Sequence, residues 1–222
     1  MRRILGLSAV VLLAMAGTAR VEDKVEPADK FIDKDLSGWE GIMEYWSVKD
    51  GALVGYTAKD PGFNTFLCSK KTYKDFEMSF KVRLKDGIGN SGVQVRSKMV
   101  DKDRKKFTVH GPQADVGQGY WGSLYGEGFG GMMEPAPKES QKAVKQKDFN
   151  DYYIKVVGKK VTIKINGETT VDQEFGEAWA KEKKGRQALP DEGIIAFQLH
   201  AGYKSMEVTF KDVKFKELKS DK

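Results

Sequence analysis

Long polar side chains recur in three segments that have the pattern of β-strands. They are Gln94 and Arg96 in the first segment, His110, Gln113 and Asp115 in the second, and Gln198 and His200 in the third. Amide, guanidinium and imidazole groups form directional hydrogen bonds, so they suit a ligand that carries many hydroxyl groups. A lone polar residue on a strand is usually a surface residue. Both histidines of the chain, however, lie on segments that also carry glutamine, which favours one shared polar cleft.

Aromatic residues follow the second of these segments. Tyr120, Trp121 and Tyr125 lie among glycines directly after it. Aromatic rings beside polar groups suit sugars, because sugar rings have apolar C–H faces and hydroxyl rims. The same rings could instead fill the core beneath a loop, and the sequence leaves both interpretations open.

Several other chemistries lack their residues. The chain has no Gly-x-Ser-x-Gly elbow of a serine hydrolase, no lysine after a glycine-rich phosphate loop and no zinc-type Cys-x-x-Cys pair. No strand carries the two alternating acids of the retaining glycosidases built on a similar sandwich. Cys68 is the only cysteine, which excludes an internal disulfide, and its apolar surroundings predict a small buried hydrophobic residue.

Alternation of apolar and polar residues dominates the rest of the chain. The clearest run extends over 76–84, and others cover 161–166, 195–200 and 208–215, where a slip at 211–213 predicts a β-bulge. The pairs Asp50-Gly51, Gly158-Lys159 and Asn166-Gly167 predict tight turns between strands. The segments 126–148 and 175–191 are expected to be long loops, with a short helix at 178–184. About ten or more strands predict an all-β sandwich or jelly roll.

The two ends of the chain are expected to lie outside this domain. Arg2 and Arg3, an apolar run over 4–16 and small residues at 17–19 have the order of a cleaved secretory signal peptide. We therefore expect a signal peptide at 1–19, a linker at 20–28, a single β domain at 29–218 and a short tail at 219–222. This organisation predicts a periplasmic or secreted protein with no membrane anchor after cleavage.

The charge of the chain says little about its partner. The net charge is +6 at pH 7, but most lysines stand beside acids, as in Lys138-Glu139. No basic stripe is interleaved with aromatic residues, so nucleic acid is not an expected partner. The lysines predict a solvated surface.

A series of motifs carries a resemblance to a known family over nearly the whole mature chain. They are FIDKDLSGW at 31–39, WSVKDGAL at 46–53, GNSGVQVR at 89–96, QAD at 113–115, GSLYG at 122–126, IKING at 163–167, and the closing segments 193–200 and 208–215. In this order they resemble the 3-keto-disaccharide hydrolase domain. The resemblance implies a concanavalin A-like jelly-roll β-sandwich and a carbohydrate substrate, an oxidised disaccharide or glycoside.

The resemblance also implies a reaction. A ketone at C3 of a sugar acidifies the proton on C2, so a base can remove it while the glycosidic oxygen leaves C1, and water then adds back. On this basis His200 or Asp115 would transfer protons, with His110 as a further candidate, and Arg96 would stabilise the enolate. Gln94, Gln113 and Gln198 would bind hydroxyl groups, and Trp121 or Tyr125 would stack on a ring.

No cofactor is demanded by the sequence, although a divalent metal held by Asp115 and a histidine could take over part of the role of Arg96. One departure from the family stands out. Members commonly carry a glutamate two residues before the Gln-x-Asp motif, where this chain has Gly111. That departure favours the alternative of a non-catalytic carbohydrate-binding module. A third possibility is a purely structural module, for which a lysine-covered face without a ligand would be expected.

Overall fold

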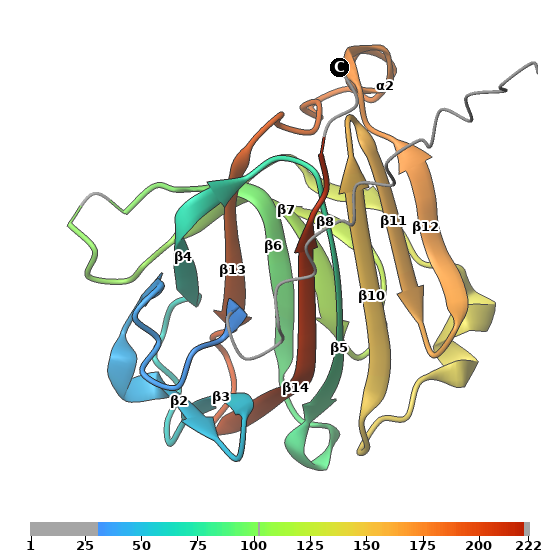
Figure 1. Ribbon diagram of the computed structural model, residues 1–222. Helices are drawn as coiled ribbons and strands as arrows, with labels where there is room; N and C mark the ends of the chain where they lie inside the picture. Colours follow the sequence, from blue (N-terminus) through green and yellow to red (C-terminus); the bar gives the residue numbers. More distant parts are fainter. Residues whose placement is uncertain (1–30, 102, 220–222) are drawn as a thin grey trace, which may run out of the picture.

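The computed structural model describes residues 31–101 and 103–219, and these form a sandwich of two antiparallel β-sheets (Figure 1). Sheet 1 has the order β1 (Trp39–Glu40), β4 (Thr65–Tyr73), β13 (Gly193–Leu199), β6 (Asn90–Met99), β7 (Val109–Gly117), β8 (Leu124–Glu127) and β9 (Gly131–Glu134). Sheet 2 has the order β12 (Glu168–Glu174), β11 (Lys160–Ile165), β10 (Asn150–Val157), β5 (Phe76–Leu84), β14 (Met206–Glu217), β3 (Ala52–Thr57) and β2 (Trp46–Lys49). The all-β sandwich prediction is confirmed. The expected signal peptide and linker lie outside the described residues.

The core lies between the sheets and is built by strand alternation. In β5 the residues Phe76, Met78 and Phe80 are buried, whereas the residues between them are partly exposed. Apolar side chains of β6, β7 and β13 enter the same core, among them Val95, Val116 and Phe197. They alternate along each strand with polar residues that point to the other face of the sheet. Burial of the apolar surfaces of both sheets stabilises their packing against each other.

The expected turns form where the sequence places them. Asn166 and Gly167 both have positive φ, at 50° and 88°, and join β11 to β12. Asp50 and Gly51 do the same between β2 and β3, with φ of 50° and 75°. Two consecutive residues with positive φ match the twist of the strands on either side, so each pair closes a tight hairpin.

The two segments predicted as loops contain short elements. Segment 126–148 was expected to lack structure, but it holds the end of β8, the strand β9 and the 3-10 helix η3 (Lys138–Ala143). Segment 175–191 holds α2 (Glu177–Glu182), close to the short helix expected at 178–184. Two further 3-10 turns are η1 (Met43–Tyr45) and η2 (Lys85–Gly87).

Two bulges redirect side chains. In β14 the register with β5 shifts between Lys211 and Lys214, and Asp212 has a φ of 54°, which confirms the bulge expected there. In β6 the register shifts between Gln94 and Lys98, and Arg96 has a φ of 47°. A bulge adds one residue to a strand, so it turns side chains away from the face that simple alternation predicts.

The outer face of sheet 1 carries a second, smaller hydrophobic cluster beside its polar residues. Its buried members are Phe66, Cys68, Phe107, Val109 and Ala196. Cys68 is fully buried here, as predicted, and burial raises the pKa of its thiol. The cluster covers one part of the outer face and leaves the part around Gln113 open to form a pocket.

None of the helices among the described residues is long and apolar enough to cross a membrane.

Candidate functional site: an acidic pocket on sheet 1

A pocket of about 330 Å³ lies on the outer face of sheet 1. It is lined by side chains from β6, β7 and β8 and from the segments around them: Asn64, Asn90, Gln113, Asp115, Tyr120, Tyr125, Glu127 and His200. Alternation along β7 explains its position, because Ala114 and Val116 enter the core and so Gln113 and Asp115 face outward. The pocket thus combines carboxyl, amide, imidazole and phenol groups.

Asp115 is the buried acid of this pocket. Its side chain is 5% exposed, and Gln113 Nε2 donates a hydrogen bond to Asp115 Oδ1 at 2.8 Å. Burial, together with the negative charge of Glu127, raises the pKa of Asp115 to about 7, although the Gln113 hydrogen bond acts in the opposite direction. A carboxyl group with this pKa can both hold and release a proton near neutral pH, as general acid–base catalysis requires.

A chain of amides supports the floor of the pocket. The side-chain amides of Gln94 and Gln113 are hydrogen-bonded at 2.9 Å, and Gln113 Nε2 also donates to Gln198 Oε1 at 3.0 Å. All three side chains are almost completely buried. Among the described residues, Nε2 of Gln198 has no hydrogen-bond partner, so it is a buried donor with spare capacity.

His200 follows the last residue of β13 and lines the pocket. Its Nδ1 lies 2.6 Å from the carbonyl oxygen of Ala201. A carbonyl oxygen only accepts hydrogen bonds, so Nδ1 carries the proton and Nε2 of the neutral ring is left as a proton acceptor. The local backbone therefore fixes the tautomer that a general base needs.

The pocket brings together five of the residues that the sequence singled out, namely Gln113, Asp115, Tyr120, Tyr125 and His200. Gln94 and Gln198 lie beneath it in the amide chain. Of the five lining residues, Tyr120 is exposed, with 48% of its surface accessible. Three lining residues were missed. Asn90 stands inside the GNSG motif, whereas no pattern in the sequence places Asn64 or Glu127 near the other residues of the pocket.

The structure does not bring Arg96 to the pocket. Its guanidinium donates to the carbonyl oxygens of Lys74, Gly158 and Pro190 and forms an ion pair with Asp75 at 2.7 Å. The bulge in β6 turns this side chain toward those loops, where it is almost fully buried. A guanidinium with these partners cannot contact a ligand beside Asp115.

Trp121 and His110 also lie elsewhere. Trp121 is 1% exposed and belongs to the core between the sheets, so its ring cannot stack on a sugar in the pocket. His110 is exposed on β7, and its ring packs against Gly128, where an added Cβ would lie 2.4 Å from the ring. It does not line the pocket.

The residues that could hold a metal are few. Within 31–101 and 103–219 no three His, Cys, Asp or Glu side chains gather closely enough to bind a metal ion. Asp115 and His200 do share the pocket, so the donors considered from the sequence are present as a pair. Asp115 and His200, with two asparagines beside them, would hold a metal ion only weakly. The pair fits a proton-transfer site better.

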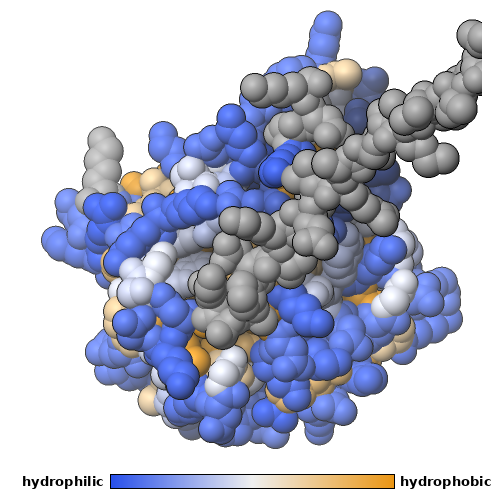
Figure 2. All heavy atoms as spheres, viewed as in Figure 1, coloured by the Kyte–Doolittle hydropathy of each residue, from blue (hydrophilic) through white to orange (hydrophobic). Residues whose placement is uncertain are grey.

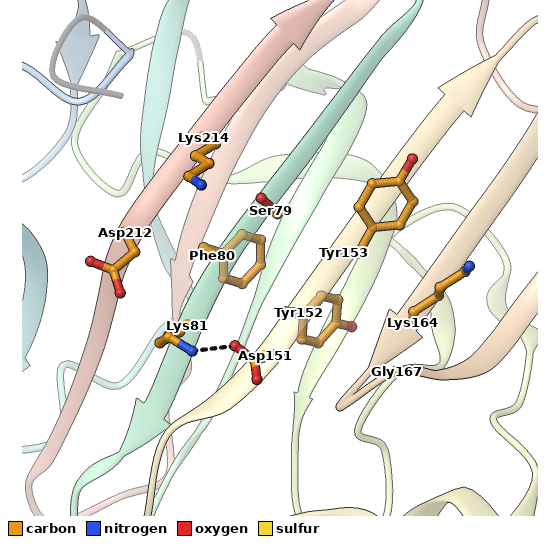
Figure 3. Close-up of a pocket in the computed structure, with 10 residues that line it drawn as sticks. All are labelled: Ser79, Phe80, Lys81, Asp151, Tyr152, Tyr153, Lys164, Gly167, Asp212 and Lys214. Atoms are coloured by element: carbon orange, nitrogen blue, oxygen red, sulfur yellow. Dashed lines mark hydrogen bonds and ion pairs between the residues drawn. The ribbon is translucent and has the colours of Figure 1, made fainter. Parts of the chain in front are cut away.

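A larger hollow of about 630 Å³ lies on the outer face of sheet 2 (Figure 3). Its charged residues include Lys81, Lys164 and Lys214, and Lys81 is paired with Asp151. The visible side of the molecule that includes this sheet is mainly hydrophilic (Figure 2). The hollow has no buried polar network like that beneath Asp115, and it matches the solvated lysine face expected from the sequence.

An all-β sandwich with a pocket of amides, acids and tyrosines on one sheet defines a carbohydrate-active domain of the jelly-roll type. A family model of the 3-keto-alpha-glucoside-1,2-lyase-like domain matches residues 27–216, and the chain belongs to this family. The resemblance stated from the motifs is thereby confirmed. Comparison with curated proteins gave no match.

Several solved structures have the same fold as this chain. One is described as a "Putative glycosyl hydrolase" from Parabacteroides distasonis, with 22% identity, a TM-score of 0.63, and coverage of 88% of this chain and 100% of the other. A second protein from that organism, described in the same words, has 21% identity, a TM-score of 0.58 and coverage of 82% and 89%. Carbohydrate-binding module CBM66 from Bacillus subtilis has 16% identity, a TM-score of 0.53 and coverage of 81% and 96%. These similarities show the fold.

Proposed function

We propose that this chain is an exported enzyme that cleaves 3-keto-glycosides by removing the C2 proton, eliminating the glycosidic oxygen and adding water. The observation that carries the proposal is Asp115, a buried carboxyl group with a pKa of about 7 in a pocket of amides and tyrosines. Membership in the lyase-like family supports the same reaction. The N-terminal motif of a signal peptide supports export.

The steps follow from the chemistry of a 3-keto sugar. His200 Nε2 takes the proton from C2, and the electrons pass to the C3 oxygen as an enolate. The enolate then reforms the ketone and expels the oxygen from C1, leaving a double bond between C1 and C2. Protonated Asp115 supplies the proton to the departing oxygen. Water then adds to the double bond: the Asp115 carboxylate takes a proton from the water as its hydroxyl bonds to C1, and protonated His200 returns a proton to C2, which restores both groups.

The enolate needs a hydrogen-bond donor, a role that Arg96 cannot fill from its position. The side-chain amide of Asn90 and the hydroxyl of Tyr125 line the pocket and are the proposed donors. The floor of the pocket is formed by the amides of Gln94, Gln113 and Gln198. Of these, Gln113 is in reach of a sugar hydroxyl. Tyr120 and Tyr125 offer rings to the apolar face of the sugar.

Nitrophenyl 3-keto-glucoside provides the direct test, because cleavage releases coloured nitrophenol. We expect turnover of this compound and none of the unoxidised glucoside, whose C2 proton is not acidic. His200→Ala and Asp115→Asn should each lower kcat by roughly 10²–10⁴-fold. Deuterium placed at C2 should be lost to solvent during the reaction.

Lys164→Ala is the matched control, since this residue lies on sheet 2, away from the pocket. It should leave kcat unchanged. Equal cleavage of the oxidised and unoxidised glucosides, or full activity of both His200→Ala and Asp115→Asn, would contradict the proposed reaction.

The alternative of a non-catalytic carbohydrate-binding module rests on Gly111, which leaves the expected position of a family glutamate without a side chain. In that case native glycans should bind in a calorimeter while keto-sugars are not turned over. His200→Ala should then weaken binding only modestly.

A further inference from the structure

The amide chain beneath the pocket has unfavourable contacts at both of its ends. Gln94 Oε1 lies 3.2 Å from the carbonyl oxygen of Gly111 and 3.1 Å from that of Pro112, so acceptors face one another there. These two carbonyl groups lie opposite the shift in register between Gln94 and Lys98. At the other end, Gln198 Nε2 has no partner among the described residues. Buried polar atoms without partners cost free energy, so a better arrangement of the same amides would be more stable.

Turning all three amides by 180° supplies the missing hydrogen bonds. The rotation exchanges the oxygen and the nitrogen of each amide and leaves the heavy-atom positions nearly unchanged. Gln94 Nε2 then donates to the two carbonyl oxygens, and Gln113 Nε2 donates to Gln94 Oε1 at 2.9 Å. Gln198 Nε2 donates to Gln113 Oε1 at 3.0 Å. The hydroxyl of Ser97, beside Gln94, fits both arrangements because it can donate or accept.

The turned arrangement requires a proton on Asp115. It places Gln113 Oε1 at 2.8 Å from Asp115 Oδ1, where Gln113 Nε2 donates in the first arrangement. Two oxygens at this distance need a hydrogen atom between them, and an amide oxygen carries none, so the carboxyl group has to supply it. The first arrangement therefore stabilises the carboxylate of Asp115, and the turned arrangement stabilises its carboxylic acid.

We propose that Gln94 is a positioning residue that keeps a proton on Asp115 by acting through Gln113. The two carbonyl oxygens beside Gln94 favour its Nε2, and this choice directs Gln113 Oε1 toward Asp115. When Asp115 gives up the proton, the amides turn back and Gln113 Nε2 donates to the new carboxylate. The carboxyl group delivers the proton to a ligand by turning about its Cβ–Cγ bond. The inference rests on the proposed function only for this delivery.

Gln94→Met tests the role of the far amide, because methionine has a similar length but cannot donate to the two carbonyl oxygens. NMR titration of the aspartate carboxyl carbons gives the midpoint of Asp115, with Asp115→Asn to assign the signal. The midpoint should fall by on the order of one pH unit, since Gln113 Nε2 is then free to donate to the carboxylate at every pH. An unchanged or higher midpoint in Gln94→Met would overturn the inference.

Gln146→Met is the matched control, because Gln146 is an exposed glutamine between η3 and β10. It should leave the midpoint of Asp115 unchanged. Gln94→Met also leaves in place the other titratable groups around Asp115, so a lower midpoint reports the amide chain. These groups are Tyr120, Tyr125, Glu127 and His200 in the pocket, and Tyr152, whose hydroxyl donates to the backbone oxygen of Asp115 at 3.0 Å.

A second measurement uses the intact protein and so does not depend on the folding of a variant. Below the midpoint of Asp115, the side-chain amide protons of Gln94 should show nuclear Overhauser contacts to the β-protons of Ser97. Above it, these contacts should weaken and contacts to the side chain of Gln113 should appear. Contacts that are the same on both sides of the midpoint would overturn the inference.

Activity separates this inference from the proposed reaction. The limb of the pH–rate profile that belongs to Asp115 should move to lower pH in Gln94→Met and stay in place in Gln146→Met. Amide contacts that change at the Asp115 midpoint, in a protein that turns over no keto-sugar, would support the amide chain and contradict only the proposed reaction.

Discussion

At the scale of single residues, the raised pKa of Asp115 suits the residue to proton transfer but lowers the stability of the folded protein at high pH. Its carboxyl group lies where the anion is poorly solvated and faces the charge of Glu127, so its pKa is about 7 instead of 3.8. The folded protein holds this proton more tightly than the unfolded chain does. The contribution of Asp115 to stability is therefore fully present below about pH 4 and is lost as the pH rises through about 7.

Asp115→Asn should remove this pH dependence. Asparagine keeps an oxygen that can accept the Gln113 hydrogen bond but carries no charge at any pH. At pH 8 the variant should have a higher free energy of unfolding than the intact protein, by on the order of a few kcal/mol, and the difference should shrink toward pH 4. Urea denaturation at several pH values measures it. Parallel pH curves for the two proteins would contradict the burial of an ionised group.

At the scale of elements, the bulge in β6 directs the side chain of Arg96 toward three loops, and its guanidinium connects them by hydrogen bonds. Arg96 joins its strand to the β4–β5 turn at Lys74, to Gly158 in the β10–β11 turn, and to Pro190 before β13. Its side chain is 1% exposed and that of Asp75 is 11% exposed. The pair is thus shielded from water, and neither of its residues lines the pocket.

Arg96→Met should destabilise the protein without altering the site. Loss of one partner of a buried ion pair costs about 3–5 kcal/mol, since the other charge stays in a region of low polarity. Chemical denaturation should show this loss, whereas kcat of the folded variant at low temperature should match the intact protein. Lys81→Met breaks an exposed pair with Asp151 and should change stability by less than about 1 kcal/mol.

Alternation predicted the elements well and the bulged positions poorly. β5 and the turn at Asn166-Gly167 follow from local patterns, because a strand repeats every two residues and these turn residues tolerate positive φ. Arg96 was misplaced because a register shift depends on the neighbouring strand. The strand β9 was missed because a four-residue edge strand rich in glycine and methionine has too few residues to show a pattern.

The site was predictable as far as it lies on regular strands. Gln113 and Asp115 share a face by parity alone, and His200 continues the parity of β13. Glu127 was not predictable, because its place depends on which residue of β7 it faces. Trp121 was left open between core and ligand, and only the packing of the turn after β7 assigns it to the core.

At the scale of the whole molecule, the charge of the pocket is opposite to that of the chain. The sequence carries a net charge of +6, yet the pocket is lined by Asp115 and Glu127, with no lysine or arginine among its described lining residues. The lysines gather elsewhere, as on the outer face of sheet 2. A ligand that enters the pocket meets carboxylates, so a neutral sugar is favoured over an acidic one.

A 3-keto-glucuronide should therefore be a poorer substrate than the matching 3-keto-glucoside. Repulsion between its carboxylate and the two acids should lower kcat/KM by about tenfold or more. The ratio of the kcat/KM values of the two nitrophenyl compounds at pH 8 measures the effect. In Glu127→Gln this ratio should be closer to one. Equal kcat/KM values would show that the substrate carboxylate points away from Glu127.

The complete burial of Cys68 has a practical consequence for studying this pocket in solution. Its thiol is buried within the hydrophobic cluster on sheet 1, and burial raises its pKa. Thiol-alkylating reagents therefore have no reactive native cysteine in the folded domain. A cysteine introduced at Gln118, which is exposed in the turn between β7 and Tyr120, would then be the one labelled position and would leave Tyr120 in place. A fluorophore attached there reports ligand entry without background from the rest of the fold.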